Sequence, residues 1–284
     1  CRTACFRGPM GIALAPSGDL YVSDADNRRL RKISPPAPPP MNGEGGEGGC
    51  RAEASAGEFA TVSTVVGGRS AKDLRLWDPS GVVVTAEGVA YVVDAGTHTV
   101  QRVSSLGEIT PLAGSGKPGY ADGAGREAQF CHPNGIALGP DGTLFVADTG
   151  NHRIRAVSQE GVVRSLCGSG APGHRDGQPH VAQFFYPVAI GADADGTLFV
   201  ADRANHRVRR ITGKGHVSTL AGSGSCCVID GKGANASFSW PNAIAVEPSP
   251  RGAVYVADTF VFQVRRIARD GTTKTISIGY PPKP

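Results

Sequence analysis

The sequence predicts an all-β chain that folds as a β-propeller of five four-stranded blades. Residues 144–154 return almost unchanged as residues 198–208, and three weaker copies of this pattern occur elsewhere in the chain. The copies hold short runs of β-branched and aliphatic residues separated by Gly, Asp or Asn, and no helical period is long enough to compete. Four antiparallel strands per repeat, arranged around an axis, make a propeller blade. The equivalent aspartates of the five copies are Asp24, Asp94, Asp148, Asp202 and Asp258.

Each repeat is expected to supply four strands in a fixed order. An apolar strand opened by proline comes first, as at 133–138, where proline is tolerated at the first position. The strand that ends in the repeated aspartate follows, and two further strands complete the blade, as at 153–157 and 162–166. The five aspartates should therefore occupy equivalent positions at the ends of second strands. A sixth blade would need roughly 40 more residues, so six blades are expected only if the chain is a fragment.

The second strand is followed by a polar signature, the tripeptide Asn-His-Arg, at residues 151–153 and again at 205–207. This pattern resembles the NHL repeat. The resemblance covers nearly the whole chain and implies a single propeller domain over residues 1–284, but it implies no activity, because propellers carry many unrelated functions. Groups that recur in successive blades are expected to maintain the fold, with the aspartate accepting hydrogen bonds within its turn and the arginine pairing near it. These recurring groups are His152, Arg153, His206 and Arg207.

Two proline-rich segments depart from the repeat. A Pro/Gly-rich insertion at 35–58 interrupts the first blade, and a Pro-rich tail occupies 280–284. The proline run of the insertion favours an extended polyproline II arm. It resembles proline-rich stretches of algal and plant wall proteins, although a plain surface insertion explains it equally well. The prolines considered as candidates for contacts are Pro35, Pro36, Pro38, Pro39 and Pro40.

The fifth repeat carries apolar residues where the other repeats have a polar turn. Phe260 and Phe262 stand in the place of the Gly-Asn-His signature. Apolar side chains in an exposed turn indicate a contact. Two interpretations stay open: the phenylalanines anchor a partner, or they pack against the first blade or the chain terminus and close the ring.

Most of the seven cysteines fall in glycine-rich loops, which favours disulfides and an oxidising compartment. The alternative is a set of free thiols in a cytosolic protein. Cys167 with Cys226 or Cys227 is one candidate pair, because these residues fall in connections of neighbouring blades, and Cys5 with Cys50 is another.

Asn235 begins an Asn-Ala-Ser tripeptide, the acceptor for N-glycosylation in a secreted protein. Together with the loop cysteines it predicts an extracellular or cell-surface location.

The sequence shows little that would carry chemistry. The inner strands, such as 135–138 and 243–246, contain no His, Asp or Glu, so we expect no catalytic group, no metal and no cofactor; His132, just before one of them, is a lone candidate. The Gly-rich connections contain Asp-Gly pairs, which we interpret as turns held by Asx hydrogen bonds and not as phosphate or calcium loops. These aspartates are Asp122, Asp176 and Asp230.

The composition limits the classes of partner that the chain is expected to bind. The net charge is only +4 and the arginines repeat around the ring, which argues against nucleic acid as a ligand. The sequence has no apolar run long enough for membrane insertion. We therefore predict a non-catalytic extracellular module that binds proteins, copies of itself or glycans and acts as a scaffold or a building block of an assembly. The alternatives are an RNA-binding propeller and a metal-dependent lyase or hydrolase.

Overall fold

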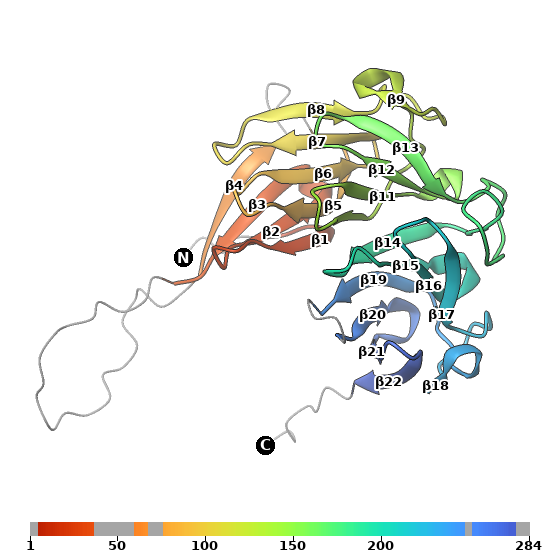
Figure 1. The fold of residues 1–284 in the computed structure, drawn as a ribbon. Helices are drawn as coiled ribbons and strands as arrows, with labels where there is room; N and C mark the ends of the chain where they lie inside the picture. Colours follow the sequence, from red (N-terminus) through yellow and green to blue (C-terminus); the bar gives the residue numbers. More distant parts are fainter. Residues whose placement is uncertain (1–4, 37–59, 68–75, 248–251, 277–284) are drawn as a thin grey trace, which may run out of the picture.

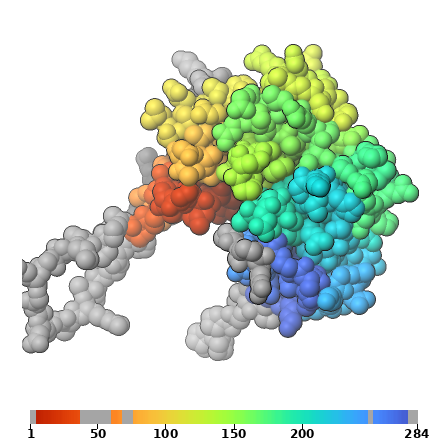
Figure 2. Space-filling model, in the orientation of Figure 1, coloured from red at the N-terminus to blue at the C-terminus, as the bar shows by residue number. Residues whose placement is uncertain are grey.

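The computed structural model describes residues 5–36, 60–67, 76–247 and 252–276. These residues form a five-bladed β-propeller, so the predicted fold class is confirmed. Each blade is an antiparallel sheet of four strands in sequence order, and two blades carry a short fifth strand at the outer edge. Figure 1 labels the strands, and Figure 2 shows the blades side by side in chain order, from red to blue.

The strands are short and evenly sized. Blade 1 contains β1 (Pro9–Leu14), β2 (Leu20–Asp24), β3 (Arg29–Ser34) and β4 (Thr61–Gly67). Blade 2 contains β5 (Pro79–Val84), β6 (Ala90–Asp94), β7 (Thr99–Val103) and β8 (Ile109–Ala113). Blade 3 contains β10 (Ile136–Leu138), β11 (Leu144–Asp148), β12 (Arg153–Val157) and β13 (Val162–Cys167). Blade 4 contains β14 (Pro187–Ala192), β15 (Leu198–Asp202), β16 (Arg207–Ile211) and β17 (Val217–Ala221). Blade 5 contains β19 (Pro241–Val246), β20 (Val254–Asp258), β21 (Gln263–Ile267) and β22 (Thr272–Ile276).

Short elements complete the blades. Two-residue strands pair with the outermost strands β13 and β22, and single turns of 3₁₀ helix occur between second and third strands or within the connections. The short strands are β9 (Gly123–Ala124) and β18 (Gly231–Lys232). The 3₁₀ turns are η1 (Ala25–Asn27), η2 (Gly125–Glu127), η3 (Thr149–Asn151), η4 (Arg203–Asn205), η5 (Gly233–Asn235) and η6 (Thr259–Val261).

The hydrophobic core lies between blades. Each blade has an outgoing face, which packs on the next blade, and an incoming face, which packs on the preceding one. Val208 and Ala221 of blade 4 share one cluster with Val256 and Ile267 of blade 5, and equivalent clusters join blades 1 and 2, 2 and 3, and 3 and 4. Successive side chains of a strand point to opposite faces of its sheet. Because both faces of a blade pack against neighbouring blades, the strands are apolar at nearly every position.

The inner strands of neighbouring blades approach each other closely. A Cβ atom added to Gly135 of blade 3 would lie 2.7 Å from the carbonyl oxygen of Val188 in blade 4. Glycine is required there because the two backbones are in contact.

The structure corrects the proposed Cys167 disulfide. Cys167 is the last residue of β13, opposite Ile154, and is buried in the core between blades 3 and 4. Its counterpart in blade 4 is Ala221, opposite Val208, so Cys167 belongs to a strand, whereas Cys226 and Cys227 lie in a loop. All three are free thiols, so the pairing of Cys167 with Cys226 or Cys227 is wrong. Burial raises the pKa of the Cys167 thiol to about 12.

Several other predicted features lie partly or wholly outside the described residues. Pro35 and Pro36 are exposed directly after β3. Outside the described residues lie Pro38, Pro39, Pro40, Cys50 and the tail at 280–284. Within the described chain, no helix has the length and apolar character needed to cross a membrane.

Candidate binding face

The turns between second and third strands lie at one edge of the ring, beside the residues that lead into the inner strands. Gly150 in the turn of blade 3 donates its N–H to the carbonyl oxygen of Cys131, and Ala204 donates in the same way to Phe185. We call this edge the turn face. It comprises five turns (25–28, 95–98, 149–152, 203–206 and 259–262) and five lead-in segments (6–8, 76–78, 130–132, 184–186 and 238–240).

The repeated aspartates end the second strands and hold these turns. The Oδ1 atom of Asp148 accepts the backbone N–H of Cys131 at 2.8 Å, and Oδ2 accepts the side-chain amide of Asn151 at 2.9 Å. One carboxylate thus fixes both its own turn and the lead-in segment. The same bonds recur at Asp202, from Phe185 N at 2.8 Å and from the Asn205 amide at 2.8 Å.

The arginine of the Asn-His-Arg signature does not pair with the aspartate, so that prediction is wrong. Arg153 donates to the carbonyl oxygens of Gly168 and Ser169, and Arg207 donates to Ser223 O at 2.7 Å. The aspartate is already paired with another arginine, two residues further along the third strand.

Three fully buried arginines bridge two aspartates each. Arg155 binds Asp148 at 2.8 Å and Asp122 at 2.6 Å. The pattern repeats with Arg209 between Asp202 and Asp176 and with Arg265 between Asp258 and Asp230. The carboxylates of Asp122, Asp176 and Asp230 therefore pair with arginine and also accept from fourth-strand residues such as Ser165. The expected Asx turns are not their role.

Burial and pairing shift these carboxyl groups in opposite directions. Burial raises the pKa of Asp202 to about 6, against the opposing effect of Arg209. Asp122 is nearer the surface; against the cost of its partial burial, hydrogen bonds from Arg155 and Ser165 lower its pKa. A signal for these arginines exists in the sequence, because Arg31, Arg155, Arg209 and Arg265 each follow a repeated aspartate by seven residues.

The repeated histidines join neighbouring blades. His152 adopts a left-handed conformation at φ 54°, and its Nδ1 atom accepts the backbone N–H of Tyr186, in the next blade, at 3.2 Å. The rings of the two residues meet edge to face at 5.0 Å. Equivalent bonds run from His132 N to His98 at 3.0 Å and from Trp240 N to His206 at 3.4 Å. Burial lowers the pKa of all three histidines, which favours the neutral ring that this hydrogen bond requires.

Phe262 takes the histidine position in blade 5, with φ 55°, but a phenyl ring cannot accept such a hydrogen bond. Its side chain is 95% exposed, and that of Phe260 is 70% exposed. Neither phenylalanine is buried against blade 1, which removes the ring-closure interpretation for the described residues.

Further exposed aromatic residues lie on the turn face. Trp77, Tyr186 and Trp240 occupy lead-in segments of blades 2, 4 and 5 and stay between 38% and 53% exposed. The Arg28 guanidinium lies 3.8 Å from the centre of the Trp77 ring, and that of Arg203 lies 4.8 Å from Trp240. Aromatic and arginine side chains are the types that dominate recognition surfaces.

A polar hollow of about 500 Å³ opens on the turn face where blades 1, 2 and 3 meet. Arg7, Arg28, Asp26, Asp78 and His132 contribute its charged and titratable side chains. Burial, and next to it the charge of Asp94, raises the pKa of Asp78. His132 is thus placed at the edge of a mixed-charge hollow that could hold a polar ligand.

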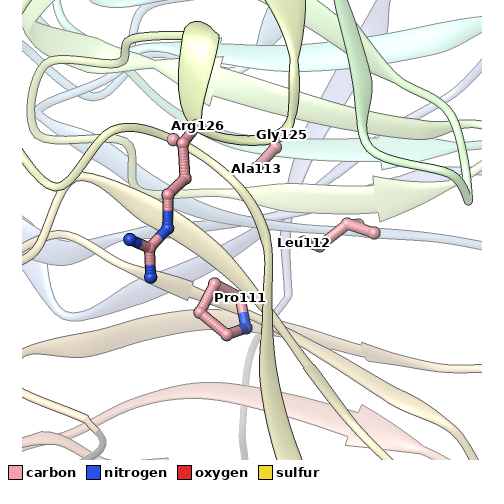
Figure 3. A pocket seen from close by; sticks show the side chains of 6 residues that line it. Pro111, Leu112, Ala113, Gly125 and Arg126 are labelled. Atoms are coloured by element: carbon pink, nitrogen blue, oxygen red, sulfur yellow. The ribbon is translucent and has the colours of Figure 1, made fainter.

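No cluster of three or more metal-ligating side chains occurs among the described residues. A second hollow, of about 230 Å³, lies beside β8 and η2 (Figure 3). Arg126 is the only charged residue among those that line it, which include Pro111 and Leu112. Acid–base chemistry needs convergent titratable groups, and this hollow does not supply them.

Asn235 ends the 3₁₀ turn η5 and is exposed, as a modified asparagine must be. The third residue of the tripeptide, Ser237, is buried, and its hydroxyl bonds that of Ser223 at 2.7 Å.

Comparisons with known proteins agree with the repeat. The NHL repeat model matches residues 130–156. The chain is 31% identical to Protein SUPPRESSOR OF QUENCHING 1, chloroplastic, of Arabidopsis thaliana over 90% of its length, and 26% identical to Teneurin-3 of Mus musculus over 89%. It covers only 24% and 10% of those proteins. NHL repeat-containing protein 2 of Gallus gallus is 28% identical over 69% of the chain and is covered to 30%.

Solved structures share the fold. An auxiliary nutrient binding protein from Bacteroides thetaiotaomicron superposes with a TM-score of 0.65 at 16% identity, over 97% of this chain and 61% of that one. A streptogramin B lyase structure gives 0.59 at 14% identity, over 98% and 72%. Identities this low establish the fold and not the activity. From its repeats, its five blades and these matches, the chain is a five-bladed β-propeller that carries an NHL repeat and is similar to NHL-repeat proteins over most of its length.

Proposed function

We propose that the chain is a non-catalytic extracellular module that binds proteins, copies of itself or glycans through its turn face, and that it serves as a scaffold in a larger assembly. The observation that carries the proposal is the exposure of Phe260 and Phe262 at positions where the other repeats have a polar turn. Exposed aromatic residues on a rigid frame offer contact area at a low entropic cost.

The rest of the turn face supports a binding role. Trp77, Tyr186 and Trp240 add aromatic surface from three blades, and the hollow beside Trp77 adds charges of both signs. Flat aromatic rings stack on sugars as well as on side chains, so both ligand classes fit this surface. The exposed prolines at 35 and 36 and the exposed Asn235 are compatible with the extracellular location that we propose.

Two alternatives are weaker. RNA binding needs accessible cations, but Arg155, Arg209 and Arg265 are fully buried and paired with aspartates. A lyase activity is suggested by the likeness to the streptogramin B lyase structure, which is one of fold alone.

The test measures binding directly. The purified chain is examined by sedimentation velocity over a range of concentrations and, labelled, on an array of extracellular glycans. We expect concentration-dependent self-association or a defined set of bound glycans, and a variant with Trp77, Tyr186 and Trp240 changed to alanine should lose it. A chain that stays monomeric and binds no glycan contradicts the proposed self-association and glycan binding, and a variant that binds as well as the wild type contradicts the role of the turn face.

A further inference from the structure

The polar hollow of about 500 Å³ on the turn face lies where two blades depart from the repeat. Blade 1 has Arg28 at the position where blades 2, 3 and 4 have the repeated histidine. Blade 2 has Gln101 where the other four blades have the arginine that pairs with the repeated aspartate. The volume is in the range of about 300–1,000 Å³ that is usual for ligand pockets. Both departures change the charges in and behind this hollow.

The guanidinium of Arg28 lines the hollow without an anionic partner. It lies 3.8 Å from the centre of the Trp77 ring, and among the described residues its side chain makes no hydrogen bond or ion pair. Arg7, the other arginine of the hollow, is by contrast paired with Asp26 at 3.5 Å. The hollow therefore contains one cation that an aromatic ring holds in place and that no carboxylate neutralises.

The carboxylate of Asp78 is the opposite case. Within the described part of the chain it accepts no hydrogen bond and no ion pair. Behind it lies the fully buried Asp94, which accepts the backbone N–H groups of Trp77 and Asp78 at 2.7 and 2.9 Å but has no arginine, because Gln101 takes that position. Burial, followed by the charges of Asp94 and Asp26, raises the pKa of Asp78, as expected for a carboxylate without a cation. A cation beside Asp78 would be attracted by both carboxylates.

We propose that this hollow binds a free α-amino acid in its zwitterionic form. The carboxylate of the ligand pairs with Arg28, and its ammonium group pairs with Asp78. These two side chains do not form an ion pair with each other, so neither neutralises the other. An α-amino acid carries both charges on one carbon and can meet both side chains at once. A ligand with a single charge would leave either Arg28 or Asp78 without a partner.

The site is built independently of the aromatic contacts in the proposed function. Phe260 and Phe262 lie on blade 5, whereas the lining of the hollow comes from blades 1, 2 and 3. The Trp77 ring is held between two turns: a Cβ atom on Gly96 would overlap it on one side, and Arg28 lies against it. The cation is therefore already positioned, which lowers the entropic cost of binding.

The first test varies the ligand and leaves the protein unchanged. Saturation-transfer NMR of the 284-residue chain with the standard L-amino acids, each at about 1 mM, identifies those that bind. Titration calorimetry then compares each bound amino acid with its N-acetyl form, which lacks the ammonium charge, and with its amide form, which lacks the carboxylate. We expect each blocked form to bind at least about tenfold more weakly. If no amino acid binds, or if a blocked form binds equally well, the proposal is overturned.

The second test assigns the two charges. Arg28→Asn removes the cation and introduces a residue that tolerates the left-handed backbone at φ 56°, and Asp78→Asn removes the anion. Each variant should bind the amino acid at least about tenfold more weakly. Arg28→Asn should also lose the discrimination against the amide form, and Asp78→Asn that against the N-acetyl form. A variant that binds more weakly but keeps its discrimination would contradict the role given to that residue.

The matched controls are Arg210→Asn and Asp195→Asn, because both residues are exposed on blade 4 and lie outside the hollow. They should bind the amino acid as the wild type does. Replacing Phe260 and Phe262 should also leave amino-acid binding unchanged. If the chain binds amino acids but neither self-associates nor binds glycans, only the proposed function fails. The reverse result refutes the amino-acid site alone.

Discussion

His152 of blade 3 accepts the backbone N–H of Tyr186 of blade 4 at its Nδ1 atom, at 3.2 Å. The same bond recurs at His98 and His206, so the histidine of the NHL signature forms a hydrogen bond between successive blades. Its left-handed backbone directs the ring across the blade boundary. This explains why the residue recurs in successive blades.

These histidine hydrogen bonds make the free energy of unfolding depend on pH. Burial lowers the pKa of His98, His152 and His206 below the ordinary value, so the unfolded chain binds protons more readily than the folded one. The stability contributed by the neutral rings is fully present above about pH 6.5 and is lost as pH falls through the lowered pKa values.

Urea unfolding of the wild type and of a triple His→Asn variant, measured from about pH 7.5 to 5.5, checks this dependence. Asparagine tolerates the left-handed backbone. The raised pKa of Asp202 acts in the opposite direction, but it affects both proteins equally. The wild type should lose more stability than the variant on acidification. If the free energies of unfolding of the two proteins change with pH in parallel, the histidine hydrogen bonds are not the pH-sensitive element.

The buried arginines should contribute more to the free energy of unfolding than the exposed ones. Arg209→Met leaves Asp202 buried without its cation, and loss of one partner of a buried pair costs about 3–5 kcal/mol. The matched control is Arg210→Met, because Arg210 is the exposed neighbour on β16 and a surface change of this kind stays within about 0.5 kcal/mol. Free energies of unfolding in urea give both values. Similar losses for the two variants would contradict the arrangement.

The Cys167 thiol should be inert. Its burial and its pKa of about 12 leave almost no thiolate, whereas Cys226 is exposed. We expect maleimide to modify Cys167 about a hundredfold more slowly than Cys226 in the native protein, and at a similar rate in urea. A peptide map without reductant that shows Cys167 joined to Cys226 or Cys227 would refute this part of the structure.

The contact between inner strands predicts a third stability effect. A methyl group at Gly135 would meet Val188 O at 2.7 Å, so Gly135→Ala should destabilise the protein by about 1–3 kcal/mol. Gly213→Ala is the control, because a Cβ there has no atom within 4 Å. Thermal unfolding of both variants measures the difference. An unchanged melting temperature for Gly135→Ala would mean that the blades are not in backbone contact there.

The strands and the blade order could be predicted because each repeat carries its own local signals, such as the opening proline and the terminal aspartate. The partner of the aspartate was assigned to the wrong arginine, since Arg153 and Arg155 lie on the same strand. The seven-residue spacing between Asp148 and Arg155, which recurs in three other repeats, is the signal that identifies the right one. The exposure of Ile12 could not be predicted from the sequence either. Ile12 and Ile136 are the same residue type in the same pattern, and only the neighbouring blade makes one exposed and the other buried.

The central claim, that the turn face is the contact surface, is tested most directly by replacing Phe260 with Ala and Phe262 with His, the residues that stand at these positions in blade 4, as Ala204 and His206. Both side chains are largely exposed, so the melting temperature should change little. Loss of two aromatic anchors should weaken self-association or glycan binding by about thirtyfold or more, corresponding to about 2 kcal/mol. If the variant associates and binds as the wild type does, in the same sedimentation and array measurements, the turn face is not the binding surface.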